Sequence, residues 1–150
     1  MTLWCPIAQL VPMSMLTKLF GGAPDPHAED VINSREVIKE GWLNKQSRNV
    51  KEWRKRYVVL TKDCLATFKT GPLEMYMMRD ATECVFFGSM MTVKSAEQET
   101  QKENSFCLQR NKDGRFFFFI ADTPAEKEAW VGAIGRQMVR KTVLIEDHDD

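Results

Sequence analysis

The sequence predicts a mainly β fold that ends in one amphipathic helix. Between residues 37 and 121, seven short runs of β-branched and aromatic residues follow one another closely, a pattern typical of an antiparallel barrel or sandwich. After the last run, apolar residues recur every four positions, which indicates a helix. The 150 residues leave room for one ordinary domain.

The strands are predicted from their composition and from the turns between them. In order, we expect them at residues 37–45, 53–60, 65–69, 83–87, 90–94, 105–110 and 115–121. The first two flank a polar link at 46–51, so we expect them to pair as a hairpin. The last two flank the turn 111–114, in which Gly114 occupies a position that usually needs a positive φ.

The helix has recognisable signals at both ends. Thr123 is a suitable N-cap, Pro124 suits the first helical position, and Glu126 completes a capping box. The basic pair at 140–141 is favourable at a helix C-terminus. The predicted apolar stripe includes Trp130, Ile134 and Met138.

The two ends of the chain differ from the folded body, which we expect over residues 36–142. Residues 1–35 form a leader that contains the Gly/Pro-rich linker 21–26. Within it, residues 12–20 can form a short amphipathic helix, which would insert at a membrane interface, dock on the domain or remain frayed. Residues 143–150 are an acidic tail that we expect to be disordered.

Charge is unevenly distributed along a chain that is neutral overall. Lys and Arg number 21, as do Asp and Glu, which argues against a protein that coats nucleic acid. Residues 39–62 contain eight bases and two acids, a net charge of +6. Such a segment suits a localised anionic partner.

Nothing in the sequence indicates an enzyme, a metal site or a cofactor. The cysteines are far apart and have no histidine cluster nearby, so we interpret them as reduced thiols of a cytosolic protein. No run approaches the roughly 20 apolar residues that a spanning helix needs. No Ser/His/Asp or Cys/His set and no phosphate-binding glycine loop is present. The cysteines are Cys5, Cys64, Cys84 and Cys107.

Both ends of the folded body resemble the pleckstrin homology family. The opening matches at residues 41–45 (GWLNK), 53–60 (WRKRYVVL) and 65–69 (LATFK), and the close matches at 116–130, where Trp130 takes the place of the family's helix tryptophan. The body is also similar to short plant proteins that contain little more than one such domain. The resemblance implies a seven-stranded bent barrel capped by the helix, with a ligand at the open end between the first strand loops.

The resemblance also implies a binding site for phosphorylated head groups. The basic signature of lipid-binding members maps onto Lys45, Arg54 and Arg56. Because Arg54 and Arg56 are two residues apart in a strand, their side chains leave by the same face, and a hairpin would bring Lys45 close to them. Arginine can engage phosphate oxygens bidentately. Lys55 should point to the other face.

The expected ligand is an acidic phospholipid at a membrane surface. Lys39, Arg48 and Lys51 would add nonspecific attraction to an anionic leaflet. Thr67 stands where trisphosphate-selective members commonly carry a tyrosine, so we expect broader recognition of phosphoinositides or of phosphatidic acid. The protein would then be cytoplasmic and peripheral, on the cytosolic face of the plasma membrane or of endosomes.

Two other interpretations remain open. The chain could be an adaptor that binds a protein through the methionine-rich residues 75–78 or through the leader, although this loop could equally pack on the leader. Phe116–Phe119 could suggest a platform for nucleic-acid bases. Strand core explains these four better, with two facing inward and two packing beneath the helix, and we expect no nucleic-acid partner.

Overall fold

The computed structural model describes residues 31–33, 36–87 and 91–146. The predicted leader helix at 12–20, the linker at 21–26 and the last four residues of the expected tail lie outside these ranges. No helix in the described part of the chain is long and apolar enough to cross a membrane.

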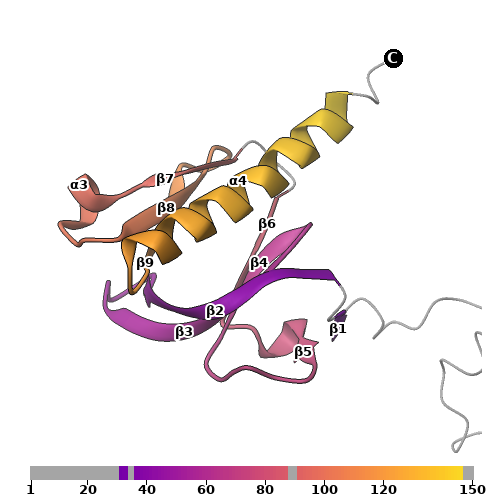
Figure 1. Ribbon diagram of the computed structural model, residues 1–150, viewed down its shortest axis with the longest axis horizontal. Coiled ribbons are helices and arrows are strands. Elements are labelled where there is room, and N and C mark those ends of the chain that lie inside the picture. Colours follow the sequence, from indigo (N-terminus) through magenta and orange to yellow (C-terminus); the bar gives the residue numbers. More distant parts are fainter. Residues whose placement is uncertain (1–30, 34–35, 88–90, 147–150) are drawn as a thin grey trace, which may run out of the picture.

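Seven strands form one antiparallel sheet, in the order β6-β4-β3-β2-β9-β8-β7 (Figure 1). The mainly β fold with one C-terminal helix is therefore confirmed. The strand order begins at β6 and ends at β7, so the sheet is open and the expected barrel is not closed by pairing among the described residues. The strands are β2 (Val37–Gln46), β3 (Trp53–Thr61), β4 (Cys64–Phe68), β6 (Glu83–Phe86), β7 (Met91–Ser95), β8 (Ser105–Arg110) and β9 (Arg115–Ile120).

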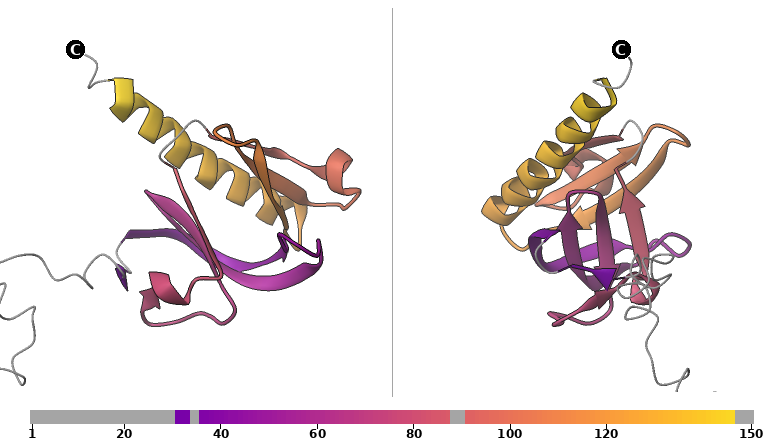
Figure 2. Two further views of the ribbon diagram at one scale, coloured as in Figure 1. Left: turned by 180° about the vertical axis from the view of Figure 1, so that it is seen from behind. Right: turned by 90° about the vertical axis from the view of Figure 1, so that its right-hand side faces the viewer.

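The end of β2 joins two halves of the sheet. β2 pairs with β3 along most of its length but with β9 only at Asn44 and Lys45. The two halves can therefore fold toward each other, and helix α4 (Pro124–Glu146) lies across the opening between them (Figure 2). α4 contacts β2, β7 and β8.

The main core lies between the two halves and α4. Trp130 is 1% exposed at its centre, and Phe106 and Phe119 stack with ring centroids 5.4 Å apart. The other members of this core include Leu43, Val58, Leu60, Leu65, Phe117, Ala133, Ile134 and Met138.

The beginning of α4 follows its sequence signals, but its end does not. The Thr123 hydroxyl accepts a hydrogen bond from the backbone N–H of Glu126 at 3.1 Å, as an N-cap does. The helix then continues through Glu146, four residues beyond the boundary expected at 142.

A second apolar cluster covers the opposite face of β3 and β4. Strand β1 (Val31–Ile32) pairs with β5 (Tyr76–Met77), which leads into the short 3-10 helix η3 (Met78–Asp80). The cluster comprises Ile32, Tyr57, Val59, Ala66, Phe68 and Tyr76. The methionine-rich loop thus packs partly on the end of the leader, although Met75 is 60% exposed.

The aromatic strand β9 divides its side chains between two faces. Phe117 and Phe119 are buried in the main core. Phe116 and Phe118 stack on each other with centroids 5.7 Å apart, and Phe116 is 40% exposed. The expectation that this second pair packs beneath the helix is wrong, because alternation along the strand turns it away from the core.

The molecule has two distinct ends. The loop between β2 and β3 lies at one end, whereas β1 and the last turns of α4 lie at the other (Figures 1 and 2). A short helix, α3 (Glu97–Thr100), connects β7 to β8.

Candidate anion-binding site

A basic cavity of about 400 Å³ lies beside the loop that joins β2 to β3. Its side chains come from three parts of the sequence: the β2–β3 hairpin with its loop, the start of β6 with the residue before it, and the start of β9. Five of them are bases and one is an acid. The lining residues are Lys45, Ser47, Arg48, Arg54, Arg56, Thr82, Glu83, Cys84 and Arg115.

The β2–β3 register brings the three predicted bases to one face. Lys45 lies directly opposite Arg54, and Arg56 lies opposite Leu43. Because positions directly opposite in an antiparallel pair share a face, Lys45, Arg54 and Arg56 all line the cavity. Lys55 is on the other face, with its amine 5.4 Å from the ring centre of Trp42.

The three bases differ in how firmly they are already held. Lys45 is only 9% exposed, and its amine forms an ion pair with Glu83 and donates to the Gln46 carbonyl at 3.3 Å. Arg54 lies at the rim and pairs at 3.1 Å with the exposed carboxylate of Glu52. Arg56 donates to the Lys55 carbonyl at 3.0 Å. An exposed pair such as Arg54–Glu52 contributes little and yields readily to a stronger anion.

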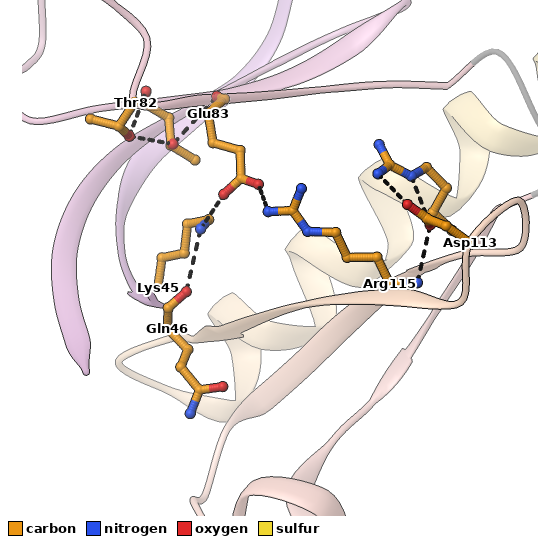
Figure 3. A network of polar contacts seen from close by, with 8 residues as sticks. Lys45, Gln46, Thr82, Glu83, Asp113 and Arg115 are labelled. Atoms are coloured by element: carbon orange, nitrogen blue, oxygen red, sulfur yellow. Dashed lines mark hydrogen bonds and ion pairs between the residues drawn. The ribbon is translucent and has the colours of Figure 1, made fainter. Parts of the chain in front are cut away.

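Sequence reasoning missed two charged residues of the site, Glu83 and Arg115, as well as the uncharged lining residues Ser47, Thr82 and Cys84. The Glu83 carboxylate lies between the Lys45 amine and the Arg115 guanidinium and forms an ion pair with each (Figure 3). Arg115 also lies 4.5 Å from the Phe117 ring centre. The one signal for Arg115 was its place immediately after the tight turn at Gly114, which does have a positive φ of 69°.

Asp113 fixes the turn from which Arg115 projects. Its carboxylate accepts two hydrogen bonds from Arg110, at 2.7 and 3.1 Å, and one from the backbone N–H of Arg115 at 3.2 Å. The hydrogen bonds from Arg110 hold the pKa of Asp113 well below its usual range.

Thr67 does not line the cavity. Its side chain is 2% exposed, and its hydroxyl lies 2.7 Å from that of Thr82. Thr82, which lines the cavity, also donates to the Thr67 carbonyl at 3.1 Å. The hydroxyls of the two threonines therefore join β4 to the segment before β6, in which Thr82 directly precedes Glu83 (Figure 3).

The three bases expected to assist are dispersed. Arg48 lines the basic cavity and also a neighbouring hollow, whereas Lys51 lines only the neighbouring hollow, together with Phe116. Lys39 belongs to neither hollow. Its amine is 3.8 Å from the Glu126 carboxylate and 5.1 Å from the ring centre of Trp130, so the structure does not bring it to the site.

The cysteines of the described residues are free thiols. The hydrogen bond with Cys64, together with burial, raises the pKa of Cys84 well above its usual range, so this thiol at the cavity wall stays protonated. The described residues contain no group of His, Cys, Asp and Glu that could hold a metal ion.

Comparison with known proteins identifies the folded body. A family model described as the PH domain matches residues 37–139. The chain is 32% identical over 111 residues to Pleckstrin homology domain-containing protein 1 of Arabidopsis thaliana, covering 74% of this chain and 75% of that protein. It is also 32% identical over 105 residues to the human Pleckstrin homology domain-containing family A member 6, but this covers 66% of this chain and only 9% of that longer protein.

A solved structure shows the same architecture. The crystal structure of the C-terminal PH domain of pleckstrin in complex with D-myo-Ins(1,2,3,4,5)P5 matches with a TM-score of 0.54 and 28% sequence identity. The match covers 67% of this chain and 97% of that one.

Proposed function

The chain belongs to the PH domain family, a family of non-catalytic modules, and we propose that its basic cavity binds the phosphorylated head group of an acidic membrane phospholipid. One observation carries the proposal. Five bases line one open cavity, although the protein has no net charge. They are the three predicted residues, Lys45, Arg54 and Arg56, together with Arg48 and Arg115.

The chemistry of the cavity suits an anion such as phosphate better than a neutral ligand. Arginine presents a planar fork of donors that matches two phosphate oxygens, and four of the five bases are arginines. The related PH domain of pleckstrin was crystallised with an inositol pentakisphosphate, so a phosphoinositide is the favoured class and phosphatidic acid the simpler alternative. The protein would dock peripherally on the cytosolic face of the plasma membrane or of endosomes.

The protein-adaptor alternative has less support from the methionine-rich loop than its sequence suggested. Met77 pairs with Val31 in the small β1–β5 sheet, and Met78 packs against the second apolar cluster. Of the three methionines, only Met75 is strongly exposed.

Co-sedimentation with vesicles tests the proposal, with Arg56→Ala compared to Lys55→Ala. The two residues are adjacent in β3 and carry the same charge, but only Arg56 lines the cavity. Losing Arg56 should cost about 1.5–3 kcal/mol, or about ten- to a hundredfold in affinity for phosphoinositide vesicles. Losing Lys55 removes only general attraction, about 1 kcal/mol or fivefold.

The proposal is wrong if the protein binds acidic and neutral vesicles equally, or if both variants lose binding to the same extent. Circular dichroism of each variant verifies that the fold is intact. A protein partner captured equally by wild type and Arg56→Ala would instead support the adaptor alternative.

A further inference from the structure

The basic cavity already contains an anion of its own. The Glu83 side chain is 16% exposed, and its carboxylate forms ion pairs with Lys45 and Arg115, whose side chains are 10% and 22% exposed. Figure 3 shows this carboxylate between the two cations. The bases of the cavity therefore fall into two groups: Lys45 and Arg115, which share the single negative charge of Glu83 and keep a net charge of +1 with it, and an arginine group formed by Arg48, Arg54 and Arg56.

We propose that Glu83 determines head-group specificity by occupying the place that a second phosphate would need, so that the site favours sparsely phosphorylated head groups over densely phosphorylated ones. This inference rests on the proposed function of the cavity. One phosphate can bind the arginine group while Glu83 keeps its two partners. A ring that carries several phosphates must also use Lys45 and Arg115, and it meets the Glu83 carboxylate there.

The position of Glu83 is fixed by the sheet. It opens β6 and lies opposite Thr67 in the ladder with β4, and its backbone carbonyl accepts a hydrogen bond from the Thr67 hydroxyl at 3.4 Å. Only its side-chain torsions can move the carboxylate. If it is displaced, it loses both ion pairs in a largely buried setting, and if it stays, it repels the incoming phosphate. Both outcomes weaken the binding of a densely phosphorylated ring, because removing the partners of a buried charge is costly.

The ion pair of Arg54 differs from the ion pairs of Glu83, and this difference supports dividing the bases into these two groups. The partner of Arg54, Glu52, is 64% exposed, so solvent and salt screen this pair and a phosphate can replace it at little cost. Glu83 is four times less exposed than Glu52. The two acids differ in burial, and only the less exposed Glu83 can act as a selective barrier.

The test compares two phosphatidylcholine vesicle preparations matched for total lipid phosphate charge, one with phosphatidylinositol 4-phosphate and one with phosphatidylinositol 3,4,5-trisphosphate. Glu83→Gln keeps the shape of the side chain and removes its charge. We expect it to raise affinity for the trisphosphate vesicles about tenfold, equivalent to 1.4 kcal/mol, and to leave affinity for the monophosphate vesicles within about threefold.

The matched control is Glu99→Gln. Glu99 is an exposed acid paired with Lys94 at 3.4 Å and is not among the cavity residues, so its loss changes net charge by the same amount. It should alter both affinities by the same factor, of no more than about fivefold, because general attraction does not distinguish two vesicle preparations of matched charge.

Glu83→Asp provides a second variant in case Glu83→Gln does not fold. It keeps the charge but withdraws the carboxylate by one methylene, so it should bind the trisphosphate vesicles more tightly than wild type and less tightly than Glu83→Gln. An unchanged or lower trisphosphate affinity in the folded variants overturns the inference, as does an equal gain in Glu99→Gln or an equal gain for both lipids.

The experiment separates an error about the role of Glu83 from an error about lipid binding itself. If wild type binds neither phosphoinositide vesicle, or if Arg56→Ala binds as wild type does, the lipid site itself is wrong and the role of Glu83 is overturned with it. If Arg56→Ala loses binding and the Glu83 variants show no lipid-dependent change, only the specificity role is wrong.

Discussion

Gly71 lies against the ring of Tyr57, a buried member of the second apolar cluster. A Cβ at position 71 would overlap that ring, so a larger residue must displace Tyr57 or shift the loop. The cluster joins β3 and β4 to the paired strands β1 and β5. The absence of one methyl group therefore allows the loop to close on the sheet.

Gly71→Ala should destabilise the protein by about 1–3 kcal/mol, the usual cost of overpacking. Urea unfolding followed by circular dichroism measures the change in the free energy of unfolding. Gly132→Ala is the matched control: it lies in α4, and its Cβ would meet only the mobile end of Arg136, at 3.4 Å. Helix propensity predicts that it stabilises by up to about 1 kcal/mol. Equal free energies of unfolding for wild type and Gly71→Ala would show that the loop can shift to make room for the methyl group without destabilising the protein.

At the level of single elements, the β8–β9 hairpin depends on the charge of Asp113. Hydrogen bonds from Arg110 lower the pKa of this carboxyl in the folded state, relative to an unfolded value of about 3.9. A carboxyl with a lowered pKa contributes stability that is fully present above its unfolded pKa. That contribution is lost as pH falls through the lower pKa of the folded state.

Asp113→Asn should therefore lower the melting temperature at neutral pH, and the difference from wild type should shrink as pH falls from about 5 to about 2. Thermal scans at several pH values measure this difference. Arg110→Gln removes the same pair and should give the same pH dependence. A difference that stays constant over this range would show that the turn does not depend on the ionised carboxylate.

The longer elements could be predicted from the sequence because their signals are local. Periodicity, the N-cap at Thr123 and the turn at Gly114 located all seven strands of the sheet and the start of α4. β1 and β5 were not predicted, because two-residue strands are too short to show alternation. The end of α4 lies beyond the expected boundary because residues 143–145 are apolar (VLI) and continue the helix as far as Glu146, so the acidic composition belongs mainly to the residues after them.

The site could be predicted only in part, because some of its residues are neighbours in sequence and others are brought together only by the folded sheet. The hairpin that brings Lys45 to Arg54 and Arg56 is local, and residue spacing was enough to place these three bases on one face. Glu83 and Arg115 meet Lys45 only because β6 and β9 approach the end of β2 from opposite sides. That approach depends on how the whole sheet bends, which no short motif records.

At the level of the whole molecule, stability and ligand binding depend on different forces. The main core is apolar, and the net charge is zero, whereas the cavity concentrates five bases at one end. Added salt screens exposed charges, since the Debye length falls from about 10 Å at 0.1 M to about 3 Å at 1 M. It has little effect on buried apolar contacts.

Raising NaCl from about 0.1 to about 1 M should therefore weaken binding to phosphoinositide vesicles at least about tenfold while the melting temperature changes little. Vesicle co-sedimentation and thermal scans on the same samples measure both quantities. Binding that resists salt would point to apolar insertion as the main contribution, and a parallel loss of stability would show that the charges also hold the fold together.

The two-ended arrangement of the molecule has a practical consequence. β1 and the last turns of α4 share the end opposite the β2–β3 loop (Figure 1). When the cavity faces a bilayer, β1 and the end of α4 are both directed away from it. A fluorescent protein or an enzyme joined through either one would be held away from the lipid, so the domain could carry such a fusion partner to a membrane without obstructing its own contact with the bilayer.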